Sequence, residues 1–189
     1  MLKVVALDIG GVCLNVHSEE IEKIFESSIP DEFTAVSHML EKGIITKLEW
    51  LNIFQYLTKN RFSNHELQTA WAKVIGESIE GMPELAQELS DAGYKLVFFS
   101  DTSESHIQEV YRNLSFANLV TGAILSHEVG AKKPDKTMYE AFENKYGKPI
   151  FYTDDQDANV KAGQNIGWES HLFTSPENMR KALVNADIL

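Results

Sequence analysis

Short apolar segments alternate with longer amphipathic segments along the chain. Five apolar runs, bounded by Gly, Asp or Ser, lie at residues 4–7, 96–99, 120–125, 150–152 and 171–173. Their hydrophobicity is continuous, which is typical of parallel strands that are covered on both faces. With helical patterns between them, these runs predict an α/β fold built on a doubly wound, Rossmann-like parallel sheet.

Proline and glycine mark the helix boundaries after residue 82. Proline is common in the first turn of a helix, and glycine readily adopts the left-handed conformation that ends one. The pattern predicts helices that begin at Pro83, near Pro134 and at Ser175, the first two of which end at Gly93 and Gly147.

Residues 15–81 interrupt this alternation, because the gap is too long for an ordinary crossover between strands. Amphipathic stripes at 21–29, 50–57 and 67–75 predict helices. Capping-box patterns, Thr46 with Glu49 and Ser63 with Glu66, mark the starts of the second and third. We therefore expect a core of residues 1–14 and 82–189 and an inserted helical cap of residues 15–81. At the carboxyl end of the first strand, such a cap would cover the site where open α/β sheets bind ligands.

Composition narrows the class of partner. Among 189 residues, 28 aspartates and glutamates outnumber 17 lysines and arginines, which gives a formal net charge of −11. This charge would repel nucleic acid and anionic lipid, so we expect neither as a partner. A small substrate, neutral or complexed with a metal, fits better. Oligomeric state is not specified by the sequence.

A single cysteine, Cys13, cannot form an internal disulfide, and it lies in an apolar run that predicts a small buried hydrophobe instead of a nucleophile. No apolar stretch has the length of a membrane span, and the first residues do not form the pattern of a signal peptide. We therefore expect a cytoplasmic protein.

Polar residues follow four of the predicted strands and should converge at one edge of a parallel sheet. They are Asp8, Ser100-Asp101, Lys132-Lys133 and Asp154-Asp155. Each group alone is also typical of a turn, a helix cap or a solvated loop. Together they supply carboxylates for a hard cation, and a hydroxyl and an ammonium for phosphate oxygens. The combination predicts magnesium-assisted phosphoryl transfer, with an aspartate available as the nucleophile.

Four motifs in this order resemble those of the haloacid dehalogenase-like (HAD) hydrolase superfamily. They are residues 7–12 (LDIGGV), 98–102 (FFSDT), 130–135 (GAKKPD) and 151–155 (FYTDD), and the helical insertion matches the cap of the family in place and size. Residues 41–46 (EKGIIT) resemble a cap turn in the branch that contains glucose-1-phosphate phosphatase-like sugar phosphatases.

The resemblance implies a role for each matching residue. Asp8 would be the nucleophile that attacks phosphorus. Ser100 would bind phosphate through its hydroxyl, assisted by the backbone amide of Asp101. Lys133, directly before the proline, would balance the charge of the phosphate and carboxylates. The implied activity is hydrolysis of a small phosphorylated metabolite, with sugar phosphates among the candidates.

The resemblance also implies a Mg²⁺ ion held by Asp8, Asp154 and the backbone carbonyl of Gly10. Three positions depart from the family pattern, among them Asp101, which stands where Asn is frequent in the sugar-phosphatase branch of the family. Most of its phosphatases have an acid/base aspartate where this chain has Gly10. A further acidic residue is usual where this chain has Ala158, and Asp157 could either replace it or cap the following helix.

Two rival functions remain open at the level of sequence. A catalytically weak or silent phosphate- or partner-binding protein would fit the departures at Gly10 and Ala158. A 2-haloacid dehalogenase would need a cationic clamp for its substrate, and Arg61 is the one arginine of the expected cap. His17 and His106 are candidates for the missing proton transfer, or ordinary polar residues.

Overall fold

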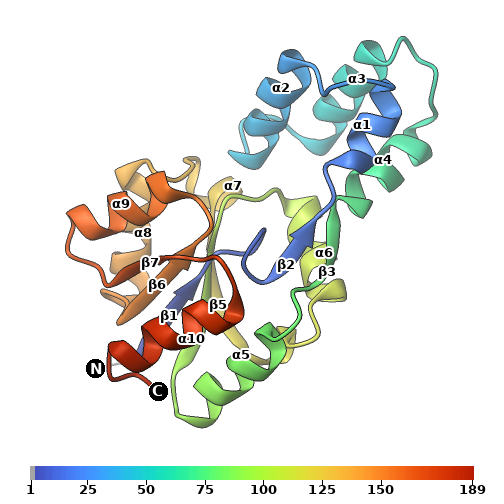
Figure 1. Ribbon diagram of the computed structural model, residues 1–189. Helices are drawn as coiled ribbons and strands as arrows, with labels where there is room; N and C mark the ends of the chain where they lie inside the picture. Colours follow the sequence, from blue (N-terminus) through green and yellow to red (C-terminus); the bar gives the residue numbers. More distant parts are fainter. Residues whose placement is uncertain (1–2) are drawn as a thin grey trace.

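A five-stranded parallel sheet forms the centre of the computed structural model, which describes residues 3–189 (Figure 1). Its order is β5-β4-β1-β6-β7. The strands are β1 (Val4–Leu7), β4 (Lys95–Ser100), β5 (Val120–Leu125), β6 (Phe151–Asp154) and β7 (Ser170–Leu172). The prediction of a doubly wound α/β fold is confirmed, and each predicted apolar run overlaps one of these strands.

The strand order reverses at β1, which pairs with β4 on one side and β6 on the other. All four residues of β1 are buried, as expected for a central strand covered on both faces. Such a reversal opens a crevice beyond the carboxyl ends of the strands, where ligands bind in this architecture. Asp8 is the first residue beyond β1 and therefore lies in this crevice.

Helices cover both faces of the sheet. On one face, α5 (Met82–Asp91), α6 (Glu104–Asn113) and α10 (Pro176–Asn185) pack against one hydrophobic cluster. On the other, α8 (Lys136–Tyr146) and α9 (Asp157–Asn165) lie beside a second cluster. Two short helices, η1 (Ala117–Leu119) and α7 (Ser126–Val129), flank β5. Gly93 and Gly147 follow α5 and α8 with positive φ angles, in agreement with the predicted helix ends.

Residues 19–73, which lie between the first two strands of the sheet, fold into four helices. They are α1 (Glu19–Phe25), α2 (Asp31–Glu41), α3 (Lys47–Leu57) and α4 (Asn64–Lys73), packed around an aromatic core of Phe33, Trp50, Phe54 and Trp71. Both capping boxes are present, at the starts of α3 and α4. The sequence analysis missed α2 as a separate helix, although its buried residues Phe33, Ser37 and Leu40 have helical spacing. The exact division between core and cap stays a proposal.

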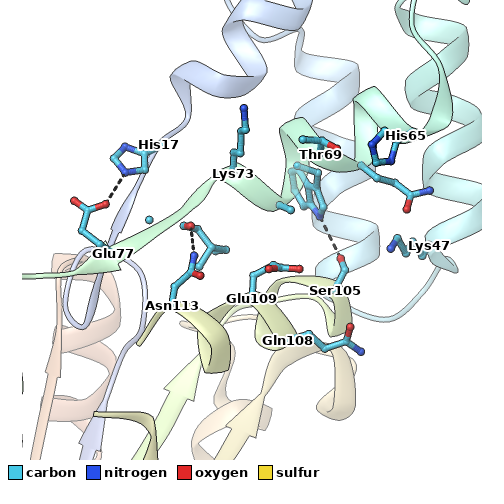
Figure 2. Close-up of a pocket in the computed structure, with 15 residues that line it drawn as sticks. His17, Lys47, His65, Thr69, Lys73, Glu77, Ser105, Gln108, Glu109 and Asn113 are labelled. Carbon is cyan, nitrogen blue, oxygen red and sulfur yellow. Dashed lines mark hydrogen bonds and ion pairs between the residues drawn. The ribbon is translucent and has the colours of Figure 1, made fainter. Parts of the chain in front are cut away.

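A two-stranded antiparallel ribbon joins the helical unit to the sheet domain. It consists of β2 (Leu14–Val16) and β3 (Ile75–Ser78). The prediction that Ile75 continues a helix is wrong, because this residue begins β3 and pairs with Val16. An open groove of about 720 Å³ lies beside the ribbon, between α4 and α6, and is lined mainly by polar side chains (Figure 2).

The cap makes a second contact with the core at the end of α2. The Glu41 carboxylate forms an ion pair with Lys132, and the Ser126 hydroxyl donates to the Glu41 carbonyl over 2.5 Å. Gly43 lies so close to the carbonyl of His127 that a β-carbon would overlap it. The cap is therefore held both at the ribbon and at α7. Among residues 3–189, no helix has the length and apolar character needed to cross a membrane.

Candidate active site

Four segments bring the predicted site residues to one edge of the sheet. Asp8 follows β1, Ser100 and Asp154 are the last residues of β4 and β6, and Lys133 lies in the loop before α8. Because β4, β1 and β6 are adjacent and parallel, their carboxyl ends meet. The structure thus gathers at one place residues that are up to 146 positions apart in the chain.

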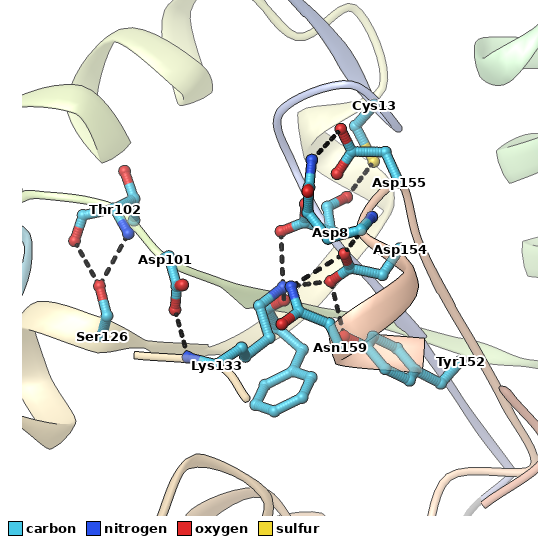
Figure 3. Close-up of polar contacts among 12 residues, drawn as sticks. Asp8, Cys13, Asp101, Thr102, Ser126, Lys133, Tyr152, Asp154, Asp155 and Asn159 are labelled. Carbon is cyan, nitrogen blue, oxygen red and sulfur yellow. Dashed lines mark hydrogen bonds and ion pairs between the residues drawn. The ribbon is translucent and has the colours of Figure 1, made fainter. Parts of the chain in front are cut away.

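Lys133 is the centre of this arrangement (Figure 3). Its buried ammonium donates to Asp8 Oδ1 at 2.9 Å, to Asp154 Oδ2 at 2.5 Å and to the Phe99 carbonyl at 2.7 Å. An ammonium has three protons, so these three acceptors satisfy it completely. Lys133 therefore fixes the two carboxylates relative to each other and to β4. The neighbouring Lys132 points instead to the cap, where it pairs with Glu41.

The charges in this cluster do not balance. Asp8, Asp154 and Asp155 each place a carboxylate oxygen within 4.8 Å of the others, and Lys133 offsets one of the three negative charges. Burial and, to a smaller extent, the nearby Asp154 carboxylate raise the pKa of Asp8 to about 6, against the lowering effect of Lys133. Burial alone would raise the pKa of Asp154 too, but Lys133 and hydrogen-bond donors bring it below its usual value. A divalent cation would relieve this excess of negative charge.

The donor set fits magnesium in particular. Mg²⁺ prefers oxygen ligands and is commonly bound by one or two carboxylates together with substrate phosphate and water. Asp8, Asp154 and Asp155 are the described residues that form such a cluster. We therefore assign this edge of the sheet as the candidate metal site.

Two residues that the sequence analysis did not single out orient Asp154. The Tyr152 hydroxyl donates to Asp154 Oδ2 at 2.6 Å, and Asn159 Nδ2 donates to Asp154 Oδ1 at 3.0 Å. The backbone amide of Gln156 adds a third bond, to Oδ1, at 2.8 Å. Alternation along β6 was the available signal for Tyr152, because residues two apart on a strand share a face. No comparable spacing in the sequence pointed to Asn159.

The structure distinguishes between the acidic residues that follow β6. Asp155 joins the carboxylate cluster, whereas Asp157 is exposed in the first turn of α9 and pairs with Lys161 at 2.5 Å. Neither alternative considered for Asp157 is observed, since it lies outside the cluster and Gln156 occupies the N-cap position. Asp155, and not Asp157, is therefore the additional acidic residue of the site.

Gly11 provides the space that Asp155 needs. Its φ angle of +73° is in the left-handed region, and a β-carbon at this position would lie 2.6 Å from Asp155 Oδ2. Alanine is therefore disfavoured here twice, by the backbone and by the neighbouring carboxylate.

We expect Gly11→Ala to weaken magnesium binding about tenfold, because the displaced carboxylate supports the metal site. The control is Gly93→Ala, whose φ of +85° imposes the same backbone cost with no atom within 4 Å of the new carbon. Both variants should lose about 1–2 kcal/mol of stability. Titration calorimetry with Mg²⁺ checks the difference, and equal affinities in the two variants would contradict it.

Gly10 and Cys13 shape the loop after β1. Gly10 has no side chain to transfer a proton, and a β-carbon here would lie 3.0 Å from Cγ2 of Val16, which is half exposed. The assignment of its carbonyl to the metal stays a prediction. Cys13 is buried, as predicted, and its thiol donates to the Asp8 carbonyl at 3.1 Å. Burial raises the pKa of this thiol well above its usual value, so it is not a nucleophile.

Ser100 and Asp101 lie at the carboxyl end of β4, and Asp101 contacts the backbone of Lys133. Ser100 is buried at the end of β4. Asp101 Oδ1 accepts a hydrogen bond from the backbone amide of Lys133 at 3.0 Å, which ties the Lys133 loop to β4. Burial raises the pKa of Asp101, with a smaller opposing effect from Lys133. The roles of Ser100 and Asp101 in substrate binding stay predictions.

Both candidate histidines have their partners outside the carboxylate cluster. The imidazole of His106 stacks on Trp71, with ring centroids 4.0 Å apart, and Nε2 lies 2.9 Å from the Trp71 carbonyl. Burial lowers the pKa of His106 to about 4, so it is neutral near pH 7. His17 lies at the ribbon between Glu19 and Glu77, beside the groove of Figure 2.

A cavity of about 270 Å³ lies between cap and core, next to these residues. Gly10, Ser100 and Asp101 form part of its core side, and residues of α1, α2 and α4 form its cap side. It is the space into which a substrate bound at Asp8 would extend.

Comparisons with known proteins agree with this arrangement. The family model described as haloacid dehalogenase-like hydrolase matches residues 2–167. An uncharacterized protein from Dictyostelium discoideum is 28% identical over 182 residues, covering 89% of this chain and 76% of that protein.

Solved structures share the fold over nearly the whole chain. A HAD family enzyme from Bacteroides thetaiotaomicron has a TM-score of 0.80 at 22% identity, covering 92% of this chain and 94% of that chain. The wild-type form of that enzyme was solved in complex with magnesium and inorganic phosphate. A HAD-like family hydrolase from Porphyromonas gingivalis has a TM-score of 0.77 at 17% identity, covering 98% and 97% of the two chains.

Proposed function

The chain belongs to the haloacid dehalogenase-like hydrolase family, and from this premise we propose that it is a magnesium-dependent phosphatase that acts on a small phosphorylated metabolite. The observation that carries the proposal is the contact of Lys133 Nζ with both Asp8 and Asp154, at 2.9 and 2.5 Å, within a cluster of three carboxylates. A nucleophile, a metal site and a fixed positive charge are what phosphoryl transfer requires.

In this proposal, Asp8 attacks phosphorus. Lys133 occupies Asp8 Oδ1, which leaves Oδ2 to form the new bond. The bond from phosphorus to the alcohol oxygen breaks, the leaving oxygen takes a proton from water, and an aspartyl-phosphate forms on Asp8. Water then attacks this phosphorus, which releases inorganic phosphate and restores the carboxylate.

The surrounding residues hold the phosphoryl group during both steps. Ser100 and the Asp101 amide bind its oxygens, and Lys133 balances their charge. Asp8, Asp154 and the Gly10 carbonyl would hold Mg²⁺, with support from Asp155. Bound magnesium would supply electrostatic stabilisation of the phosphoryl oxygens next to the carboxylates. The cap would limit access of bulk water to the aspartyl-phosphate.

The rival chemistry, dehalogenation, lacks its cationic clamp in this structure. Arg61 pairs with Glu26 and donates to backbone carbonyls of the cap, and it does not line the cavity next to Ser100. This observation favours phosphate over a 2-haloacid as the substrate group. A cytoplasmic location and the absence of nucleic-acid and membrane partners stay predictions from the sequence.

Hydrolysis of acetyl phosphate tests the proposal directly, because this small substrate needs neither a matching cap pocket nor an acid for its leaving group. We expect release of inorganic phosphate with Mg²⁺ and loss of the activity with EDTA. No hydrolysis in magnesium would favour the silent, phosphate-binding alternative. Consumption of a 2-chloro acid in place of phosphate release would select the dehalogenase.

We expect Gly10→Asp to increase kcat for alkyl phosphates such as glycerol 1-phosphate, by about a hundredfold, because it supplies the missing general acid. The half-exposed Val16 side chain can move to admit the new β-carbon. Gly10→Asn is the matched control, with the same size and no acidic proton. Steady-state kinetics check the prediction, which fails if both variants change the rate equally.

A further inference from the structure

The cavity between cap and core is placed to receive the leaving group of the substrate. It extends from Gly10, Ser100 and Asp101 to side chains of the cap. Gly10 lies close to Asp8 in the chain and Ser100 on the neighbouring strand, so the leaving group of a phosphate ester bound at Asp8 would extend into this space. This inference rests on the proposed phosphatase function. In such an enzyme, the side chains of this wall determine which alcohol the site accepts.

Large apolar side chains form most of the cap side of the wall. Ile21, Phe33, Trp71 and Val74 all line the cavity and are at most 9% exposed. Phe33 and Trp71 belong to the aromatic core of the cap, with ring centroids 6.1 Å apart. Because this packing is shared with the rest of the bundle, the wall is preformed and apolar.

Trp71, His106 and Ser37 are polar residues of this wall that are already engaged, whereas Ser18 and His38 on the cap side make no side-chain hydrogen bond within residues 3–189. Trp71 Nε1 donates to Ser105 Oγ at 3.3 Å, and His106 Nε2 contacts the Trp71 carbonyl. The hydroxyl oxygen of Ser37 accepts from Trp50 Nε1 at 3.2 Å. A leaving group with several hydroxyls would lose its hydrogen bonds to water, and Ser18, Ser37 and His38 are among the few cap-side groups that could replace them, which makes its binding costly.

The charged groups of the wall are acidic. Glu41 and Asp101 line the cavity, and no lysine or arginine is among its lining residues. Glu41 is neutralised by Lys132, and Asp101 Oδ1 is bound to the Lys133 amide. A carboxylate or second phosphate on the leaving group would therefore meet two carboxylates and no lysine or arginine, with His38 as the one cap-side imidazole. A cationic leaving group would compete with Lys132 for Glu41, and with the charges of Lys133 and Lys132 that already act on Asp101.

We propose that the substrate is the monophosphate of a small, uncharged alcohol with an apolar carbon skeleton, such as a single ring or a short branched chain. The volume agrees with this size, because about 270 Å³ is below the roughly 300–1,000 Å³ of pockets for drug-sized ligands. Sugar phosphates are disfavoured because their hydroxyls would lose hydrogen bonds to water. Phosphorylated acids are disfavoured because their negative charge would meet the carboxylates of the wall.

Competitive inhibition of acetyl phosphate hydrolysis tests this specificity without requiring turnover. Benzyl phosphate, glycerol 1-phosphate, phosphoglycolate and phosphocholine all have a primary alkoxy group and differ in what it carries. We expect the inhibition constant of benzyl phosphate to be at least about tenfold lower than the others. Tighter binding of any of the other three, or equal binding of all four, would overturn the proposal.

A charge introduced into the wall provides a second test. Thr34 lies on α2, lines the cavity and is exposed, so substitution should be tolerated by the fold. Thr34→Arg should lower the ratio of the inhibition constants of phosphoglycolate and benzyl phosphate about tenfold, whereas Thr34→Gln should keep the wild-type order. If the folded arginine variant, verified by circular dichroism, leaves this ratio unchanged, the cavity does not hold the leaving group.

The two proposals fail in different ways. Absence of acetyl phosphate hydrolysis would contradict the phosphatase function itself. Hydrolysis of acetyl phosphate with the wrong order of inhibitors would leave that function intact and contradict the apolar alcohol alone.

Discussion

Replacing Asp8 by asparagine should lower kcat for acetyl phosphate by roughly 10⁴-fold or more, because the amide cannot attack phosphorus. The side chain keeps its size and can still accept from Lys133 Nζ through its carbonyl oxygen. Loss of activity would thus reflect lost chemistry and not a collapsed site. Phosphate release under single-turnover conditions measures the effect.

Asp157→Asn is the matched control for this variant. It makes the same chemical change on a carboxylate that is exposed and paired with Lys161. We expect its rate to be close to that of the wild type. A rate in Asp8→Asn that equals the rate in Asp157→Asn would remove Asp8 as the nucleophile.

Lys133→Met should have the largest effect on stability. The substitution removes a buried ammonium and leaves two carboxylates and the Phe99 carbonyl without their donor. Breaking a buried charge pair on one side typically costs about 3–5 kcal/mol of the free energy of unfolding. Urea denaturation in EDTA measures this cost, and added Mg²⁺ should recover part of it by supplying positive charge.

Lys132→Met is the control that the chain itself offers. It is the adjacent lysine, and its partner is the single carboxylate of Glu41 at the cap contact. We expect a loss of about 1 kcal/mol or less. Similar losses in the two variants would contradict the central position of Lys133.

The sequence predicted the strands well because their signal is local. The runs at residues 4–7 and 120–125 coincide with β1 and β5. In the central strand β1, the continuous apolar pattern reflects burial on both faces. The ribbon of β2 and β3 was missed because its strands are only partly buried and form no continuous apolar run. The end of the third predicted helix was wrong because Ile75 continues the apolar spacing of the helix and yet begins β3.

The candidate site could be predicted only in part. Asp8, Lys133 and Asp154 follow strands or lie in a recognisable motif, and the topology brings them together. The choice of Asp155 over Asp157 depends on the path of one loop and on the space left by Gly11, which spacing along the chain does not specify. The bonds of Tyr152 and Asn159 to Asp154 depend on side-chain direction, and the apolar cavity depends on how the cap docks.

In the proposed reaction, phosphoryl transfer proceeds through Asp8. The most direct test of this step is mass spectrometry of peptides from protein that is acid-quenched during turnover of acetyl phosphate with Mg²⁺. We predict one phosphoryl group on the peptide that contains Asp8, lost on treatment with hydroxylamine and absent from Asp8→Asn. Turnover with no adduct on that peptide, or with an adduct that persists in Asp8→Asn, would contradict the account.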